Sequence, residues 1–354
     1  MSFNTRVDIC CGVGGTGKTT TSAALALAAA ANGERVVVLT IDPARRLADA
    51  LGIDTLGNEP RPVEGVGPGT LDALMLDKKR TWDALVHDHA TPETAEALMA
   101  NPYYRAVTTR LSGSQEYMAV EKLHQLAVQG SWDRVVLDTP PAQHVLDFFR
   151  APQRMRDILD RSMLKAILEP GGGLRAAATR RALGIVERIA GDGVMGDIRE
   201  FFALFSELSA GARERSKDVA ELLHSERCRY WLVSDADAPE RNDLLGFLEV
   251  LRDEGMQLGG LLVNRVQPVP TGPLPSLEAL TEALGEPAAL ALLALPERAR
   301  TRAYGHREAA RSLGRAAGGA PVWLVPERLG GVKDTQDLLA LAPHLPPNPP
   351  ASLL

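Results

Sequence analysis

The residues whose types and spacing most clearly allow chemistry lie at positions 12–20, in the sequence GVGGTGKTT. They fit the phosphate-binding pattern G-x-x-x-x-G-K-T, with Gly12, Gly17, Lys18 and Thr19 at its fixed positions. In such a loop, backbone N–H groups close around phosphate oxygens, and the dipole of the following helix favours negative charge. Lys18 is expected to reach the β- and γ-phosphates of a nucleotide, and the Thr19 hydroxyl to bind Mg²⁺. The alternative is a glycine-rich turn that binds nothing.

The segments on both sides of this loop support the nucleotide-binding interpretation. Residues 6–11 form a mostly apolar run, which predicts a short buried strand. Residues 19–31 are rich in Ala and Leu without Pro or Gly, which predicts a helix. A strand, a glycine turn and a helix N-terminus together make an anion site. The loop residues predicted to contact the nucleotide are Gly12, Gly14, Gly15, Thr16, Gly17, Lys18, Thr19 and Thr20.

Asp42 closes a second predicted strand. Residues 35–42, RVVVLTID, form a near-continuous β-branched run, which is typical of a parallel-sheet strand that is covered on both faces. Ligands of such sheets gather at the carboxyl ends of the strands, so we expect Asp42 to face the nucleotide. Its position also allows an alternative, in which Asp42 is the N-cap of a helix over residues 44–51.

Asp138 closes a third strand, which is predicted over residues 134–137. An acidic residue at the end of a second apolar strand is what a phosphate-loop enzyme needs to hold Mg²⁺, directly or through water. Pro140 and Pro141 follow and force an extended exit, which predicts a loop over the phosphates. The predicted catalytic residues are therefore Lys18, Asp42 and Asp138, and the predicted metal ligands are Thr19 and Asp138.

The order of the predicted elements indicates an α/β fold of the P-loop NTPase type, with a mainly parallel sheet flanked by helices. Further strands are expected at residues 229–233, 258–264 and 321–325. The P-loop domain is expected to comprise residues 1–147 and 227–345, with an inserted helical subdomain at 148–226 and a disordered tail at 346–354.

The predicted helical subdomain carries large apolar residues at helical spacing. They are expected on one face of a helix and are Ile198, Phe201, Phe202, Phe205 and Leu208. Two interpretations are open. This face packs against the core in the ordinary way, or it lines an exposed apolar groove for a hydrophobic client, in which methionines add adaptability.

The composition argues against several classes of protein. The chain has 354 residues and a net charge of −6, and nothing in it indicates binding to nucleic acid or to an anionic membrane. We find no signal-peptide pattern, and the most apolar run, residues 23–31, is too short to cross a bilayer. We therefore expect a cytoplasmic protein that is not integral to the membrane. Cys10, Cys11 and Cys228 are expected to be buried, reduced thiols.

Taken together, four motifs resemble those of one family. GGTGKTT, TIDPA, LDTPPAQH and LVN, in this order, are similar to the motifs of the ArsA-type ATPases. That family includes the arsenite-pump ATPase and the targeting factors for tail-anchored membrane proteins. The resemblance extends over residues 6–340. It implies ATP and Mg²⁺ as cofactors, ATP hydrolysis that drives a conformational switch, and a dimer whose two nucleotides face one another.

The resemblance also implies roles for individual residues. Asp42 would orient or activate the attacking water, and Asp138 would lie near Mg²⁺. Thr20 would support the α-phosphate. Asn264 would hydrogen-bond adenine and Pro326 would lie against the adenine ring, although residues of these types at strand ends are usually structural.

Three departures from the family pattern leave alternatives open. The signature lysine, which reaches the nucleotide of the other subunit, is Val13 here, so its charge is missing. There is no C-x-x-C after Asn264 for a zinc bridge, and no cysteine in residues 148–226 for a metalloid site. The partner is therefore expected to be a second copy or a related subunit that carries the lysine. The alternative functions are a nucleotide-dependent binding module with negligible turnover and, disfavoured by the cysteines, a subunit of an arsenite-efflux ATPase.

Overall fold

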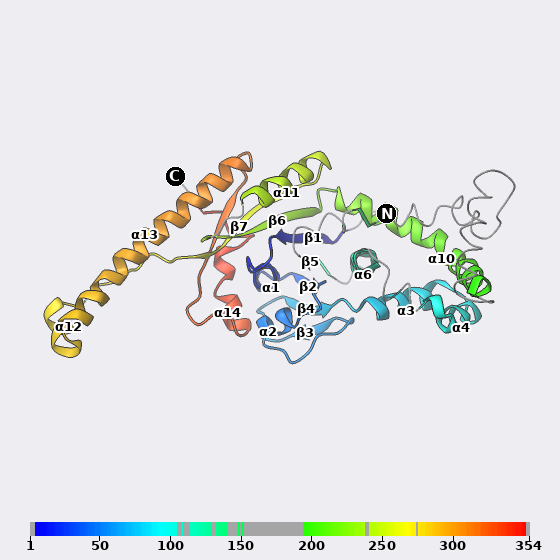
Figure 1. Cartoon of the computed structure of the whole chain (residues 1–354), viewed down its shortest axis with the longest axis horizontal. Coiled ribbons are helices and arrows are strands. Elements are labelled where there is room, and N and C mark those ends of the chain that lie inside the picture. Colours follow the sequence, from blue (N-terminus) through cyan, green and yellow to red (C-terminus); the bar gives the residue numbers. More distant parts are fainter. Residues whose placement is uncertain are drawn as a thin grey trace.

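The computed structural model describes residues 4–104, 108, 114–128, 132–140, 148, 150, 151, 194–237, 241–273 and 275–351. Most of the predicted helical subdomain therefore lies outside the described residues, and α10 (Val194–Leu223) makes up most of the part that is described. Figure 1 shows a body built on one sheet, from which a long helical arm extends.

The sheet has eight strands in the order β3-β4-β2-β5-β1-β6-β7-β8. All pairs described are parallel except β3 with β4, which is antiparallel. This confirms the predicted α/β fold with a mainly parallel sheet. The strands are β1 (Arg6–Gly12), β2 (Arg35–Thr40), β3 (Arg61–Val63), β4 (Thr70–Met75), β5 (Arg134–Asp138), β6 (Cys228–Asp235), β7 (Leu258–Val266) and β8 (Val322–Pro326).

Helices cover both faces of the sheet (Figure 1). One face packs against α1 (Lys18–Ala31), α2 (Arg46–Leu51) and α14 (Thr335–Leu339), with the 3₁₀ turn Ala342–His344 beside them. The other face packs against α3 (Lys78–His89), α4 (Pro92–Ala100), α6 (Ser114–Val128), α10 (Val194–Leu223) and α11 (Arg241–Asp253). The arm consists of α12 (Leu277–Leu284) and α13 (Glu286–Ala316), and the C-terminal part of α13 joins the second face.

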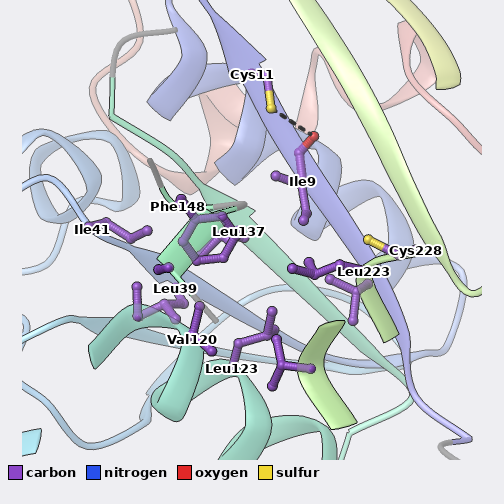
Figure 2. Packing of buried hydrophobic residues seen from close by; sticks show 14 of the residues in the cluster. Ile9, Cys11, Leu39, Ile41, Val120, Leu123, Leu137, Phe148, Leu223 and Cys228 are labelled. Atoms are coloured by element: carbon purple, nitrogen blue, oxygen red, sulfur yellow. Dashed lines mark hydrogen bonds between the residues drawn. The ribbon is translucent and has the colours of Figure 1, made fainter. Parts of the chain in front are cut away.

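Alternation along β1 divides its side chains between these two cores. Cys10 lies in the core beneath α1, whereas Cys11 lies in the opposite core with Cys228. Figure 2 shows Cys11 and Cys228 on this second face among Ile9, Leu137 and Leu223. All three cysteines are buried and free, as the sequence predicts.

The aromatic face of α10 packs into the core. Phe201 and Phe205 are buried and stack with ring centroids 5.5 Å apart. Phe205 also lies against Trp82 of α3, at 5.9 Å between centroids. The groove interpretation is therefore wrong for these two residues, because each has a large apolar neighbour rather than solvent. The side chains of Ile198, Phe202 and Leu208 lie outside the described residues.

The chain after the last helical turn differs from the predicted disordered tail. The Trp323 indole N–H donates to the carbonyl of Asn348 at 2.8 Å, and the Ala351 amide donates to the carbonyl of Val322 at 2.9 Å. These bonds attach residues 346–351 to β8, and residues 352–354 lie outside the description. Among the described helices, none combines the length and apolarity that crossing a membrane requires.

Candidate functional site

Two glycines of the 12–20 loop, Gly12 and Gly17, are required by close packing. A Cβ atom at Gly12 would lie 2.3 Å from the carbonyl oxygen of Val233 on β6. A Cβ atom at Gly17 would lie 2.2 Å from the Asn264 side-chain nitrogen, and Gly17 also has a φ of +84°. Both approaches are shorter than any side chain tolerates, so the neighbouring strands β6 and β7 determine the shape of this loop.

Helix α1 begins directly after the loop and presents its N-terminus to a cavity. Its N-cap residue is Gly17, which provides no side-chain cap, and no acidic residue stands in its first turn. The first N–H groups of such a helix have no partner within the helix and attract an anion. The strand β1 that feeds the loop lies between β5 and β6, at the centre of the sheet.

Lys18 is buried at this helix start. Its ammonium group donates to the carbonyl of Val13 at 2.9 Å, so the lysine folds back over its own loop. Burial lowers the pKa of Lys18, and the nearby Asp138 carboxylate opposes that shift. A lysine held in this place supplies positive charge at the mouth of the loop.

Thr19 and Asp138, the two predicted metal ligands, are joined by a hydrogen bond. The Thr19 hydroxyl donates to Asp138 Oδ2 at 2.8 Å, and the Thr40 hydroxyl donates to the same oxygen at 2.8 Å. Ser22 lies 3.5 Å from Asp138 Oδ1. The Asp138 side chain is buried, and this burial raises its pKa to about 6. A buried carboxylate beside a threonine hydroxyl is the type of oxygen donor set that Mg²⁺ takes, so these residues fit the metal.

Asp42 lies on the same cavity as Lys18, but its carboxylate has local partners. Its Oδ1 accepts from the Ala44 amide at 2.9 Å, and its Oδ2 pairs with the Arg46 guanidinium at 2.9 Å. The N-cap residue of α2 is Arg45, so the helix-capping alternative for Asp42 is wrong. From the sequence, Arg45 and Arg46 could supply positive charge in place of the missing lysine, although two arginines that open a helix are more often solvated; the ion pair of Arg46 with Asp42 was not anticipated.

Two adjoining cavities are lined by most of the predicted site residues, but not by Gly12, Thr16 or Asp138. The first has a volume of about 410 Å³ and is lined by the loop together with Asp42, Arg46 and Thr139. The second has a volume of about 600 Å³ and is lined by residues that include Asn264 and Pro326. Gly17, Thr20, Arg265 and Val332 line both cavities, so the two spaces meet at the start of α1.

Asn264 and Pro326 lie at the carboxyl ends of the neighbouring strands β7 and β8. The Asn264 side-chain N–H donates to the carbonyl of Thr16 at 3.0 Å and thereby holds the phosphate loop. Arg265, the next residue, has a φ of +57° and pairs with Asp235 at 2.6 Å. The two residues predicted to contact adenine therefore line a cavity that the phosphate loop also lines. Arg265 lines the same cavity, and sequence reasoning did not predict it.

Comparison with known proteins identifies a family for the N-terminal half of the chain. Residues 5–179 match the family model ArsA_ATPase, described as anion-transporting ATPase. This part of the chain belongs to the ArsA-type ATPase family. The family that the four motifs predict is thus confirmed.

Several named relatives match a part of the chain. The ATPase ASNA1 homolog of Babesia bovis is 34% identical over 164 residues, which are 46% of this chain and 43% of that protein. The ATPase GET3 of Malassezia globosa is 30% identical over 156 residues, 44% of either chain. A candidate arsenical pump-driving ATPase of Halobacterium salinarum is 31% identical over 176 residues, 46% of this chain and 26% of that protein. The matches thus span less than half of these relatives, all of which carry the name ATPase.

Proposed function

We propose that the chain is a Mg²⁺-dependent ATPase of the ArsA type, in which ATP binding and hydrolysis drive a conformational switch. The observation that supports this most strongly is the hydrogen bond between Asp138 and Thr19, a residue that lines the first cavity. The first cavity would hold the phosphates and the metal ion, and the second cavity, which Asn264 and Pro326 line, would hold the adenine base; we call it the base pocket. The relatives named above are ATPases, which agrees with this function.

Phosphate binding in this proposal uses the loop backbone and Lys18. The N–H groups at the start of α1 hold phosphate oxygens, and Lys18 exchanges the Val13 carbonyl for the β- and γ-phosphates. Thr20 lines both cavities and would support the α-phosphate. The exchange is favourable because a buried ammonium group gains a charged partner in place of a neutral one.

Thr19 and Asp138 would hold Mg²⁺, directly or through water. When bound, the ion neutralises charge on the β- and γ-phosphates. The burial that raises the pKa of Asp138 would be offset by the ion, so the carboxylate is expected to be fully charged in the loaded protein. Thr40 and Ser22 keep the carboxylate oriented from β2 and α1.

Asp42 would orient the attacking water from the end of β2. In its present arrangement the carboxylate bonds Arg46, whose side chain is exposed and whose ion pair is therefore weak. ATP in the cavity would offer Arg46 a phosphate and free Asp42 for the water. This exchange of partners is the switch that we propose. In it, Arg46 would supply positive charge at the phosphates of a chain that has Val13 in place of the signature lysine.

The test of this proposal is ATP binding by Lys18→Ala. We expect its affinity for ATP to fall below detection in isothermal titration, with an unchanged melting temperature. Lys79→Ala is the matched control, because Lys79 is an exposed lysine that pairs with Asp83 on α3, away from both cavities. ATP binding by Lys18→Ala with the affinity of the unsubstituted chain would contradict the proposed site.

A second candidate function is a nucleotide-dependent binding module with negligible turnover. Val13 in place of the signature lysine favours it, since the valine supplies no charge for the transition state. Steady-state phosphate release, with Lys18→Ala as the blank, separates the two candidates. Release above the blank supports the ATPase, whereas tight ATP binding with release equal to the blank supports the module.

Partners and location belong to the same proposal. We propose a cytoplasmic protein that works as a homodimer, or as a heterodimer with a related subunit that carries the lysine, and that handles a hydrophobic client protein. A subunit of an arsenite-efflux ATPase is disfavoured, because all three cysteines are buried in strands of the sheet. Turnover that rises on addition of arsenite would bring that alternative back.

A further inference from the structure

The helices α12 and α13 form an arm that projects from the body (Figure 1). We call residues 276–296 the leucine hairpin, in which α12 folds back on the first part of α13. Among the described residues, six of the seven large hydrophobic side chains that are exposed lie in α12 or α13. They are Leu277, Leu284, Leu290, Leu292, Leu295 and Tyr304.

The hairpin cannot bury its own apolar surface. Residues 287–296, PAALALLALP, contain no polar side chain, so this part of α13 is apolar on every side. A helix of that kind is normally buried in a core. Here Ala289 is buried against α12, but Leu284, Leu290 and Leu295 are 54%, 51% and 52% exposed. Two helices share a single seam, and side chains outside the seam face solvent until another chain covers them.

The base of the arm is firmly attached to the body. Ala310 and Leu313 of α13 belong to the core on the second face of the sheet, and Ala303 is also buried. His306 is also buried, and its Nε2 lies 2.8 Å from a carboxylate oxygen of Asp237, while its Nδ1 accepts from the Gln267 amide at 3.0 Å. The apolar hairpin is therefore presented at a fixed position, as an interaction surface needs to be.

The charges at the two ends of the hairpin are of opposite sign. Glu278, Glu282 and Glu286 precede the apolar segment, whereas Glu297, Arg298 and Arg300 follow it, so the charge is negative before the segment and net positive after it. Fourteen residues of helix separate positions 286 and 300, a length of about 21 Å. If a second hairpin lies antiparallel on the first, each acidic tip meets the basic segment of the other chain.

We propose that the leucine hairpin binds the same hairpin of a second copy of this chain, in an antiparallel arrangement with two-fold symmetry. The four helices form a small bundle, with the leucines inside and the Glu and Arg side chains paired at its rim. The surface is self-complementary, as a two-fold interface requires. Arg300 is already within 3.6 Å of Glu297, but that pair is exposed and weak enough to rearrange. The acidic tip also opposes an anionic bilayer as the alternative occupant.

The first test measures self-association by sedimentation of the whole chain without nucleotide. We expect a reversible dimer in the unsubstituted protein. The double variant Leu290→Ser, Leu295→Ser removes four leucines from each dimer and should raise its dissociation constant about 10²- to 10³-fold. Its melting temperature at low concentration should stay unchanged, because both leucines are already half-exposed. A chain that is monomeric at high concentration, or a dimer that this variant leaves intact, would overturn the proposal.

The second test exchanges charge across the interface. Glu282→Arg and Arg298→Glu should each weaken the dimer about tenfold through like-charge contacts, whereas the chain that carries both should recover most of its affinity. Glu249→Arg is the matched control, because Glu249 is exposed and belongs to α11 rather than to the leucine hairpin. Recovery in the combined variant supports the antiparallel pairing. If the combined variant instead loses as much dimer affinity as the two single variants together, that pairing would be overturned.

This association does not depend on the proposed ATPase activity. The hairpin uses no residue of the phosphate loop, so Lys18→Ala should form the same dimer as the unsubstituted chain. Loss of ATP binding with an intact dimer, or the reverse, separates the failure of one proposal from the failure of the other. Vesicles or an apolar peptide that bind the hairpin while the sedimentation stays that of a monomer would replace the second copy as its occupant.

Discussion

Asp138→Asn provides a direct test of how the metal end of the site is constructed. Burial raises the pKa of Asp138 to about 6, whereas an ordinary aspartate titrates near 3.8. The folded protein therefore binds this proton more tightly than the unfolded chain does. As the pH rises from 3.8 to about 6, charging the carboxylate lowers the free energy of unfolding, and above about 6 the loss is constant. A difference of about two pKa units corresponds to about 3 kcal/mol.

The asparagine removes this charge but keeps an acceptor oxygen for the hydroxyls of Thr19 and Thr40. We therefore expect Asp138→Asn to be more stable than the unsubstituted chain by up to about 3 kcal/mol at pH 7.5, without Mg²⁺ or nucleotide. The gain should shrink as the pH falls through 6 and nearly vanish near pH 4. The same variant should lose Mg²⁺-dependent ATP turnover, because a neutral amide does not replace the carboxylate as a metal ligand.

The assay is urea unfolding at pH 4.5, 6.0 and 7.5 in the presence of EDTA. Asp8→Asn is the matched control, because Asp8 is also a buried aspartate of the central strands, but it pairs with Arg134 and accepts from the Trp231 indole at 2.7 Å. Its replacement should destabilise the fold at pH 7.5, by about 1–3 kcal/mol. If Asp138→Asn is also less stable at pH 7.5, burial does not dominate at Asp138, and our account of the carboxylate is refuted.

Three further predictions concern other parts of the chain. Asp42→Asn should leave ATP affinity nearly unchanged and lower turnover by about 10²- to 10⁴-fold, and normal turnover would remove Asp42 from the reaction. Phe205→Ala should lower the free energy of unfolding by about 3–5 kcal/mol in urea titration, because its ring packs on Trp82 and Phe201, and a negligible change would reinstate the groove. Val13→Lys should raise turnover and tighten ATP-dependent association if two phosphate loops face one another; sedimentation and turnover that do not change would mean that they do not.

The parts of the site that follow from local sequence were predictable. A glycine pattern between an apolar strand and an alanine-rich helix identifies the phosphate loop, because each signal depends on neighbours in the chain. What the sequence could not provide is the partner of each group across the sheet. The Thr40 hydroxyl reaches Asp138 only because β2 and β5 pair in register, and Gly12 must be glycine because β6 passes beside it.

The arm was missed for a different reason. Pro296 lies inside α13, and the usual inference is that a proline ends a helix at the preceding residue. In addition, residues 287–296 are apolar throughout and residues 297–302 are almost all charged or polar. Neither segment alternates between apolar and polar residues in the way that predicts an amphipathic helix. The strand β3 was not predicted because it has only three residues, with Pro62 in the middle. Its edge position in the sheet accommodates the proline, which has no N–H group to donate.

The family match covers only the N-terminal half of the chain. The ArsA-type match ends at residue 179, and it includes the phosphate loop, Asp42 and Asp138. Asn264, Pro326 and the whole arm come from the region beyond it. The residues proposed to act at the phosphates therefore lie inside the family match, whereas Asn264, Pro326 and the leucine hairpin lie outside it. The two regions meet where Asn264 holds the Thr16 carbonyl, so a change in the base pocket can reach the phosphate loop through one hydrogen bond.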